Sequence, residues 1–363
     1  MPPDTSVSDP PTESAESSVA GESAVSAESA ESAVSAESAA PAISARGLAR
    51  TYGEVTAVDA LDLTIHQGEI YGLLGPNGAG KSTTVKMLCT LLAPTGGHAD
   101  VAGFDIVARP KDVRLRIGVA LQDVALDPKQ TGLELLRLQG QLYGLRRDEI
   151  EARLVDLREL VDIGDALDRR IETYSGGMRR RLDLAAALVH NPDVLFLDEP
   201  TTGLDPISRA SVWQEVQRLN DELGMTILLT TQYLEEADEL CDRVGIVDNG
   251  RLVAEGTPGE LKRSIGTDVV FARIEGDAAA ARAALDGVYG VVGVEGRDHE
   301  LTISVEDGSS AIGPIAIALH DASVRVRDLT LRTPTLDDVF LELTGAHFDT
   351  DAVGTAATGE DRP

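Results

Sequence analysis

Four short apolar runs stand out between Ile43 and about Arg263, and a glycine, a proline or a polar turn follows each of them. In chain order they read IYGLLG, VLFLD, TILLT and RVGIVD. Continuous apolar runs of this length are typical of parallel strands that are buried on both faces of a sheet. The pattern therefore predicts an α/β core within a domain of residues 43–266.

Between Asp123 and Pro192 the pattern changes to apolar residues spaced three and four apart. It is clearest in GLELLRLQGQLYG, RDEIEARLVDLRELV and GMRRRLDLAAALVH. This spacing is typical of amphipathic helices that bury one stripe. We therefore expect a helical subdomain, over about residues 123–192, inserted into the α/β core.

A third pattern runs from Thr267 to Gly345, where segments typical of strand, helix, strand, strand, helix and strand follow one another. They read DVVFARIEG, AAAARAALDGV, GVVGVEGR, ELTISVE, SAIGPIAIALHDA and VRVRDLTLRTP. This order is that of a ferredoxin-like unit. We expect residues 267–345 to form a small α+β accessory domain.

Both ends of the chain have a composition that does not support a core. Residues 1–42 are rich in Ser, Ala and Glu, the unit SAES recurs, and no Lys or Arg occurs before Arg46. Such a segment buries too little apolar surface to order itself. Residues 346–363 are small and acidic. We expect two disordered tails, at 1–42 and at 346–363.

The charge balance excludes one class of partner. Asp and Glu number 61 against 32 Lys and Arg, so the formal net charge is −29. Nucleic acids attract basic surfaces, so no nucleic-acid partner is expected. No apolar run reaches the ~18 residues of a membrane span, and the first residues lack a signal-peptide layout. We expect a cytoplasmic protein whose role at a membrane would need a partner chain, with Cys89 and Cys241 as small core residues.

The stretch GPNGAGKST fits the pattern GxxxxGK[ST] and stands between an apolar run and an apolar-periodic segment, which is the strand, loop and helix context of a phosphate-binding loop. Glycines let backbone N–H groups turn toward phosphate oxygens, and the following helix N-terminus favours anions. Lys81 would pair with the outer phosphates, and Ser82 would give a hydroxyl to Mg²⁺. The predicted nucleotide-binding residues of the loop are Gly75, Pro76, Asn77, Gly78, Ala79, Gly80, Lys81, Ser82 and Thr83.

The stretch VLFLDEP ends an apolar run in two carboxylates. Ligands of open α/β sheets sit beyond the carboxyl ends of the strands, so we expect Asp198 to complete the Mg²⁺ shell. Glu199 follows it and is placed to polarise an attacking water. Taken alone, this stretch would equally fit a strand that simply ends in acidic turn residues.

A second candidate anion site lies in TYSGGMRRRLDLAAALV, where a Ser-Gly-Gly turn precedes a helix. Such a turn presents a hydroxyl and backbone amides. The three arginines at 179–181 favour a solvated helix face over direct contact with phosphate.

With these motifs in hand, the chain resembles the ATP-binding subunits of ABC transporters. YSGGM is similar to the family signature LSGGQ, and Tyr52 in RTYGEV matches the aromatic residue that stacks on adenine. Gln122 in VALQD matches a glutamine that senses Mg²⁺ and water, and Asp205 in PTTGLDP matches the loop that crosses to a second subunit. Read alone, the last stretch would only be a helix cap by Asp205 before Pro206.

The resemblance implies a P-loop NTPase core of ABC type with an antiparallel β subdomain and the inserted helical subdomain. It also implies ATP and Mg²⁺ as cofactors, with Ser82, Gln122 and Asp198 at the metal. Two copies of the chain would face head to tail, so that Ser175, Gly176 and Gly177 contact the ATP of the partner subunit. A separate integral-membrane permease would complete the machine and place this chain at the inner face of the cell membrane.

Within the family, TTQYLEEADELCDRV, GRLVAEGTPGELK and PTLDDVFLELTG resemble the ATPases of prokaryotic drug exporters of the daunorubicin-resistance type. The last stretch also fits an amphipathic closing helix, Leu336 to Leu343, that docks on the core. ABC ATPases outside transport are the alternative, although they usually carry two cores, a coiled coil or basic patches. A regulatory subunit that binds ATP with little turnover is the third reading.

Only Gln232 favours that third reading, because the broad family has a histidine there that contacts the terminal phosphate. Glutamine offers a neutral amide donor in its place. Losing one charge-assisted donor could lower the rate on the order of 10²-fold. The drug-resistance subset itself carries glutamine in this stretch. We therefore expect Glu199 and Gln232 to be the catalytic residues of a slow but real ATPase.

Overall fold

The computed structural model describes residues 40–121, 126–160, 164–297 and 299–345. The two tails predicted from composition therefore fall almost wholly outside the described residues. Ala42 is an exception, because it is buried and its N–H donates to the Ile65 carbonyl. The core thus includes Ala42, one residue before the predicted boundary at Ile43.

A six-stranded sheet forms the centre of the α/β core. The four apolar runs of the sequence form its four adjacent strands β9, β3, β8 and β7, which are parallel to one another. Every residue of β3, β7 and β8 is buried, as expected for strands covered on both faces. The strands, in sheet order, are β10 (Arg251–Gly256), β9 (Arg243–Asp248), β3 (Ile70–Leu74), β8 (Thr226–Thr231), β7 (Val194–Asp198) and β6 (Ile117–Ala120).

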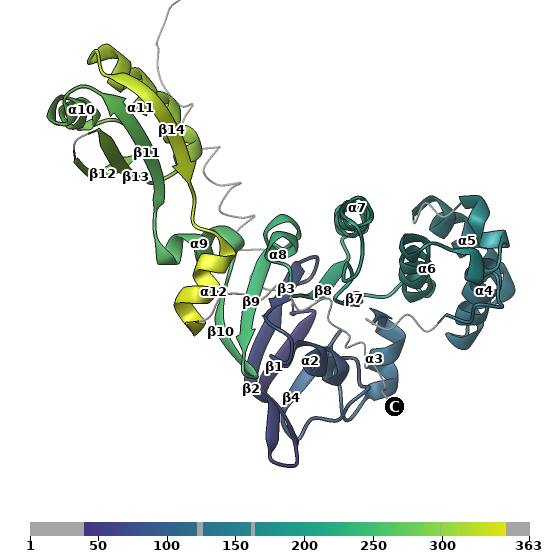
Figure 1. Ribbon diagram of the computed structural model, residues 1–363. Helices are drawn as coiled ribbons and strands as arrows, with labels where there is room; N and C mark the ends of the chain where they lie inside the picture. The colour runs from purple at the N-terminus through teal and green to yellow at the C-terminus, as the bar shows by residue number, and fades with distance from the viewer. Residues whose placement is uncertain (1–39, 122–125, 161–163, 298, 346–363) are drawn as a thin grey trace, which may run out of the picture. The chain divides into compact units, whose positions relative to one another are not determined.

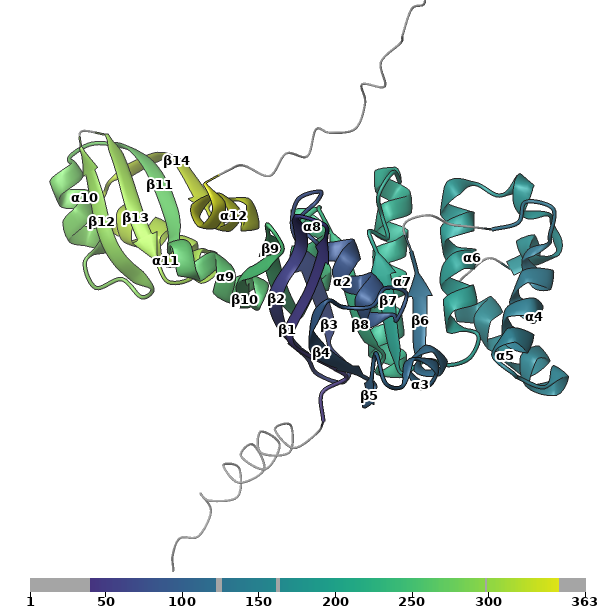
Figure 2. The same ribbon diagram turned by 90° about the horizontal axis from the view of Figure 1, so that it is seen from below.

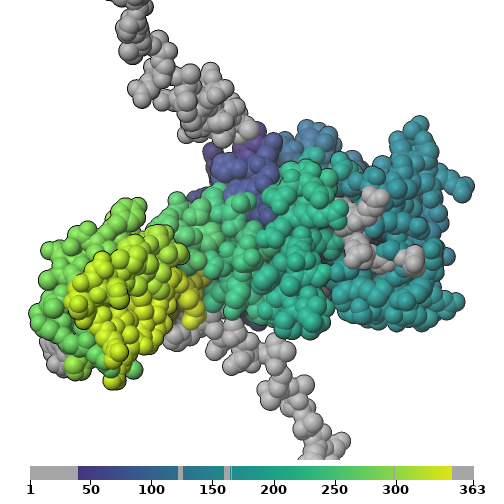
Figure 3. All heavy atoms as spheres, turned by 90° about the horizontal axis from the view of Figure 1, so that it is seen from above, coloured from purple at the N-terminus to yellow at the C-terminus, as the bar shows by residue number. Residues whose placement is uncertain are grey.

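A second, antiparallel sheet carries the order β2, β1, β4 and β5. Asp59 of β2 and Arg251 of β10 form an ion pair of 2.6 Å across the two sheets. Strands β2 and β10 are in contact, and Figure 3 shows the purple N-terminal part of the core beside the green part of the chain. The bounds are β2 (Val55–Ile65), β1 (Ile43–Tyr52), β4 (Gly96–Val101) and β5 (Phe104–Asp105). Helices α2 (Lys81–Leu88) and α3 (Pro110–Arg116) share the core beneath this sheet.

Three longer helices form the inserted subdomain, shown in teal in Figure 1. They are α4 (Gly132–Leu142), α5 (Arg147–Leu160) and α6 (Gly176–Leu188), with short 3₁₀ turns at Gly164–Asp168 and Ile171–Thr173. A reciprocal pair of hydrogen bonds between Thr131 and Glu134 starts α4. Leu136, Leu157 and Leu182 are fully buried and belong to the same apolar core as the parallel sheet. The α/β fold with an inserted helical subdomain is thus confirmed.

Three helices, which follow β7, β8 and β10, cover the parallel sheet and share that core. They are α7 (Pro206–Leu223), α8 (Leu234–Leu240) and α9 (Pro258–Ile265). Asp205 caps α7 through the backbone N–H groups of Ile207 and Ser208, and Pro206 occupies its first turn. The helix-cap interpretation of this turn is therefore correct.

The C-terminal domain has a four-stranded antiparallel sheet in the order β12, β13, β11, β14 (Figure 2). With two helices behind it, this is the ferredoxin-like arrangement that the sequence predicts. Its own core includes Ile303, Ile315 and Leu319. The bounds are β11 (Asp268–Glu275), α10 (Ala278–Leu285), β12 (Val291–Arg297), β13 (Glu300–Val305), α11 (Gly308–Asp321) and β14 (Arg325–Arg332).

The closing helix α12 (Leu336–Thr344) packs against α8 and α9. Its buried side chains Leu336, Val339 and Phe340 belong to the core of the parallel sheet, not to that of the C-terminal domain. The predicted amphipathic closing helix therefore does dock on the core. Across the part of the chain that the structure describes, no helix has the length and apolarity to cross a membrane.

Candidate functional site

The phosphate-loop residues connect β3 to α2 at the carboxyl edge of the parallel sheet. Two of its glycines have no room for a side chain. A Cβ at Gly75 would lie 2.3 Å from the Val247 carbonyl oxygen, and one at Gly80 would lie 2.4 Å from that of Ala57. Gly80 also has a φ of 105°, in the left-handed region. The glycines thus set the close approach of this loop to its neighbours.

Helix α2 starts directly at Lys81 and has no side-chain cap on its first turn. Uncapped N–H groups and the helix dipole favour an anion at this position. Lys81 is buried, and its Nζ donates to the carbonyls of Gly75 at 2.6 Å and Pro76 at 3.1 Å. Burial lowers the pKa of Lys81, and the neighbouring carboxylates Glu199 and Asp198 oppose that shift. The loop therefore holds a positive charge at the mouth of an anion site.

Asp198 lies where β7 ends, and its carboxylate faces the phosphate loop. Ser82 Oγ donates to Asp198 Oδ1 at 3.0 Å, and Thr230 Oγ1 donates to the same oxygen at 2.6 Å. Mg²⁺ prefers oxygen ligands and binds proteins through one or two of them together with substrate phosphates. The hydroxyl of Ser82 and the carboxylate of Asp198 fit such a metal. Gln122, the third predicted ligand, lies outside the described residues.

Glu199 follows Asp198 in a backbone conformation that a residue with a side chain rarely adopts, with a φ of 48°. Its N–H donates to the Thr230 carbonyl at 3.1 Å and to Thr230 Oγ1 at 3.0 Å. Its Oε1 lies 3.6 Å from Lys81 Nζ, and its Oε2 accepts a hydrogen bond of 3.2 Å from Thr202 Oγ1. The structure thus brings Lys81, Ser82, Asp198 and Glu199 together.

Gln232 lies just beyond β8, the strand next to β7, so it follows the same sheet edge as Asp198. The backbone turns tightly there, because the Tyr233 N–H donates to Thr231 Oγ1 at 2.8 Å. The guanidinium of Arg209, on α7, lies 4.3 Å from the centre of the Tyr233 ring. The residue after Gln232 thus contacts α7, and Gln232 itself is partly buried at the sheet edge.

Tyr52 ends β1 and has 47% of its surface exposed. Arg50 lies 4.5 Å from the centre of its ring and donates to the Ala93 carbonyl at 2.8 Å. A ring with a cation on one side and an exposed remainder is suited to stacking on a flat ligand.

The Ser-Gly-Gly turn forms the beginning of α6. Ser175 caps the helix by accepting from the Met178 N–H at 3.3 Å, and Gly176 and Gly177 make its first turn. Gly177 faces α7, since a Cβ placed there would lie 3.5 Å from Ser208 Oγ. Ser208 Oγ in turn donates to Asp205 Oδ2 at 2.7 Å. The signature turn and the Asp205 turn are therefore neighbours.

The interpretation of residues 179–181 as one solvated face is wrong for Arg180. Arg179 is exposed, but Arg180 is only 8% exposed and points into the protein. Arg181 is partly buried and contacts Ser211 and Glu215 of α7. The two apolar positions Leu182 and Leu184 gave no sign that Arg180 would turn inward.

Sequence reasoning also missed two buried polar groups beside the site. Thr230 bridges Asp198 and Glu199, as described above. Glu236, on α8, is 1% exposed and accepts from Thr201 Oγ1 at 2.8 Å and from Trp213 Nε1 at 2.9 Å. Burial raises the pKa of Glu236. The sequence did carry one sign of this burial, because Glu236 lies on the same face of α8 as the apolar residues Ala237 and Leu240.

Comparison with known proteins agrees with this geometry. A family model described as ABC transporter matches residues 58–202, and one described as the C-terminal domain of DrrA1-3-like ATP-binding proteins matches residues 256–344. The chain is 46% identical over 317 residues to the daunorubicin/doxorubicin resistance ATP-binding protein DrrA of Streptomyces peucetius, covering 86% of this chain and 96% of the relative. It is 36% identical to the linearmycin resistance ATP-binding protein LnrL of Bacillus subtilis, covering 82% and 96%.

Solved structures share the fold of the core. The cbiO1 subunit of Clostridium perfringens, part of the ABC transporter complex cbiONQ, superposes with a TM-score of 0.58 at 28% identity, covering 62% of this chain and 94% of that one. A dimer of the ATP-binding cassette MJ0796 with ADP and Pi gives a TM-score of 0.54 at 25% identity, covering 59% and 98%. With the phosphate loop, the paired carboxylates and the signature turn in place, this chain belongs to the family of ABC transporter ATP-binding proteins.

Proposed function

We propose that this chain is the ATP-hydrolysing subunit of an exporter that removes a drug, an antibiotic or another lipophilic compound from the cell. One observation carries the proposal most directly. Lys81, Ser82, Asp198 and Glu199 meet at the ends of β3 and β7, with 3.6 Å between Lys81 Nζ and Glu199 Oε1. Phosphoryl transfer to water requires a cation at the phosphates, oxygen ligands for Mg²⁺ and a carboxylate base, and these residues supply all three.

Each residue has a role that its surroundings support. Lys81 and the N–H groups at the start of α2 bind the phosphates of ATP. Ser82 and Asp198, with Gln122, hold Mg²⁺, which neutralises charge on the phosphate oxygens when it is bound. Glu199 orients a water and accepts its proton on a carboxylate oxygen. The water oxygen bonds to the γ-phosphorus as the bond to the bridging oxygen of ADP breaks, so the products are ADP and phosphate.

The adenine ring and the γ-phosphate of ATP would each have one further contact. Tyr52 stacks on adenine, with Arg50 behind its ring. Gln232 donates an amide hydrogen bond to the γ-phosphate, as the histidine of other family members would, without adding charge. We infer slow but real turnover from this neutral donor.

The active form is a head-to-tail dimer of two copies. Ser175, Gly176 and Gly177 offer a hydroxyl and helix N-terminal amides at a site that lacks a lysine of its own. It would contact the phosphates held by the partner subunit, with Asp205 at the crossing between copies. ATP binding then closes the dimer and hydrolysis opens it, which is how nucleotide switches commonly couple chemistry to motion.

This chain has a groove of about 590 Å³ that is a candidate docking site for the separate membrane subunit. It is lined by Leu115, Leu142 and Leu121, and Leu142 is 71% exposed. Lys111 and Arg114 also line it, on a chain whose formal charge is −29. Because Leu121 leads directly into Gln122, a cytoplasmic helix with apolar and acidic side chains that docks here would reach the metal-sensing loop. This contact would place the chain at the inner face of the membrane.

The test of the function compares two lysines of the same helix. Cells that make the chain with its membrane subunit are exposed to daunorubicin, a compound named for the relatives. Lys81→Ala should remove the resistance, while Lys86→Ala, at an exposed position of α2, should keep it. Equal resistance in both variants would contradict an ATP-driven export.

The groove has its own test. Leu142→Glu should abolish co-purification with the membrane subunit and leave the ATPase rate of the isolated chain unchanged. Val155→Glu, at an exposed apolar position of α5, is the matched control and should keep the complex. A Leu142→Glu variant that still co-purifies would place the membrane contact elsewhere.

A further inference from the structure

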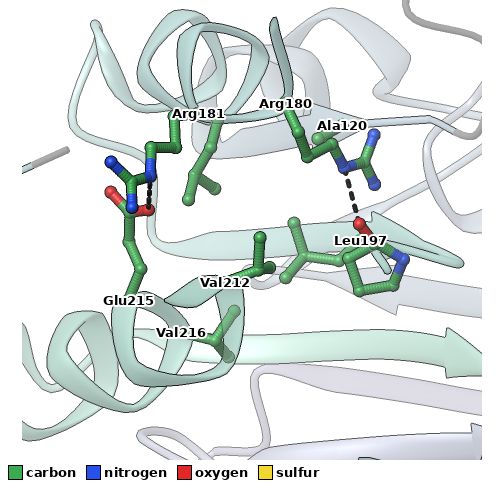
Figure 4. A pocket seen from close by; sticks show the side chains of 9 residues that line it. Ala120, Arg180, Arg181, Leu197, Val212, Glu215 and Val216 are labelled. Atoms are coloured by element: carbon green, nitrogen blue, oxygen red, sulfur yellow. Dashed lines mark hydrogen bonds and ion pairs between the residues drawn. The ribbon is translucent and has the colours of Figure 1, made fainter. Parts of the chain in front are cut away.

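Arg180 is buried although a single charged residue in a protein interior is expensive unless its donors are satisfied. It lies in the second turn of α6, the helix that begins at the signature turn. Its neighbour Arg181 leaves the same helix in another direction, toward Glu215 of α7 (Figure 4). The surroundings of Arg180 therefore have to explain why an arginine is kept there.

Four acceptors surround the Arg180 guanidinium. Nε donates to the Pro200 carbonyl at 3.1 Å, the bond drawn in Figure 4, and Nη2 lies 3.4 Å from the Asp198 carbonyl. Nη1 donates to the Leu121 carbonyl at 2.8 Å and to Asp183 Oδ2 at 3.2 Å. The planar fork of an arginine can reach several acceptors at once, which a lysine cannot do.

Two of these acceptors are the carbonyls on either side of Glu199. Glu199 has a φ of 48°, and such a conformation persists only where the surrounding structure holds it. Thr230 holds its N–H side and Arg180 holds the flanking carbonyls. Since the backbone direction sets where the carboxylate points, Arg180 acts on the position of the base.

The remaining contacts extend the link. Leu121 directly follows β6 and precedes Gln122 in the chain, so the same guanidinium also contacts the backbone at the end of that strand. Asp183 neutralises the charge of Arg180 from within α6. One side chain thus joins the signature helix to the backbone beside Glu199 and to Leu121, the residue before Gln122.

We propose that Arg180 is a positioning residue that places Glu199 according to the position of α6, so that docking of the signature turn on the partner subunit's ATP aligns the base. The inference rests on the proposed function, in which Glu199 is the base and the dimer is head to tail. Arg180 touches neither ATP nor water in this account, and it acts on the base through the backbone beside Glu199.

The test is a double-mutant cycle with Arg180→Lys and Glu199→Gln. Arg180→Lys should lower kcat roughly 10- to 100-fold, the loss typical of a slightly misplaced catalytic group, and leave the KM for ATP and the affinity for a fluorescent ATP analogue within about twofold. In the Glu199→Gln background, Arg180→Lys should not lower the residual rate further, because residues that act as one unit are not additive. Arg179→Lys, one position away and exposed, should leave kcat unchanged.

A second variant covers the case in which Arg180→Lys does not fold. The double substitution Arg180→Gln with Asp183→Asn removes both buried charges, so neither partner is left unpaired. It should show the same loss of kcat with unchanged affinity for the ATP analogue. Full activity of this variant would overturn the inference, because no guanidinium would then be needed beside Glu199.

The outcomes separate the inference from the function on which it rests. Three results would overturn the inference alone. Arg180→Lys could lower the rate by the same factor in the wild-type and Glu199→Gln backgrounds, it could leave kcat unchanged, or it could change only the KM for ATP. A Glu199→Gln variant that hydrolyses ATP at the full rate would overturn the proposed function and the inference together.

Discussion

Thr230 Oγ1 donates a hydrogen bond of 2.6 Å to Asp198 Oδ1 inside the protein, where both residues are buried. The two residues are register partners on the neighbouring strands β7 and β8. The same hydroxyl oxygen accepts from the Glu199 N–H at 3.0 Å. One side chain of β8 therefore fixes both Asp198, the proposed metal ligand, and the backbone of Glu199, the proposed base.

Thr230→Val keeps the shape of this side chain and removes its hydroxyl. We expect a fall in kcat of about tenfold or more, because Asp198 and Glu199 both lose an orienting bond. The free energy of unfolding in urea should fall by about 1–3 kcal/mol, the typical effect of leaving a buried polar group unsatisfied. Thr230→Ser keeps the hydroxyl and should retain most of the rate. Equal rates in Val and Ser variants would argue against the bridge.

Two glycines of the phosphate loop offer a matched comparison. Gly78 has a φ of 85° and open space around it, whereas a Cβ at Gly80 would collide with the Ala57 carbonyl. Gly78→Ala should lower the free energy of unfolding by about 1 kcal/mol, from the backbone conformation alone. Gly80→Ala should lower it more and also weaken ATP binding. Urea titrations of the two variants without nucleotide would reveal the difference, and equal losses would contradict the collision.

Gln232→His tests whether the site is adapted to a neutral donor. The guanidinium of Arg209 lies over the ring of Tyr233, the residue next to Gln232, so this part of the site already carries a positive charge. We expect steady-state ATPase rates that are unchanged or lower in Gln232→His. A gain approaching 10²-fold would instead identify the wild-type site as compromised by its glutamine.

Asp183 predicts a measurable pH dependence of stability. Burial raises the pKa of its carboxyl to about 6, against the opposing effect of Arg180. Since the unfolded chain releases this proton near pH 4, the folded state binds it more tightly, and the resulting stabilisation is lost as the pH rises to about 6. The free energy of unfolding of the wild type, measured relative to Asp183→Asn, should fall by about 3 kcal/mol between pH 4 and pH 7. A pH-independent difference would contradict the buried carboxyl.

Local sequence was sufficient to predict the motifs whose structure depends only on neighbouring residues. The phosphate loop needs glycines at fixed offsets, the Asp198-Glu199 pair ends an apolar strand, and Asp205 precedes a proline that starts a helix. These features are set within a few residues, and the fold built from them is confirmed. The placement of Gln122 and of the two tails stays a prediction, because they lie outside the described residues or nearly so.

Contacts between residues far apart in the chain could not be predicted from local sequence. Thr230 reads as the polar end of a strand, and only the pairing of β8 with β7 gives it two acidic neighbours. Arg180 sits in a run of three arginines that is typical of an exposed face, and its burial depends on carbonyls at residues 121, 198 and 200. Such contacts depend on how separate elements pack, which no local pattern encodes.

The most direct test of the account is ATP hydrolysis by purified Glu199→Gln protein, measured beside Glu235→Gln at an exposed position of α8. The account predicts that Glu199→Gln binds ATP with nearly wild-type affinity, loses hydrolysis by at least ~10²-fold and accumulates as an ATP-bound dimer on size-exclusion chromatography, while Glu235→Gln keeps the wild-type rate. Wild-type hydrolysis by Glu199→Gln would contradict it, because no other described carboxylate stands beside Lys81 and Asp198 in the role of base.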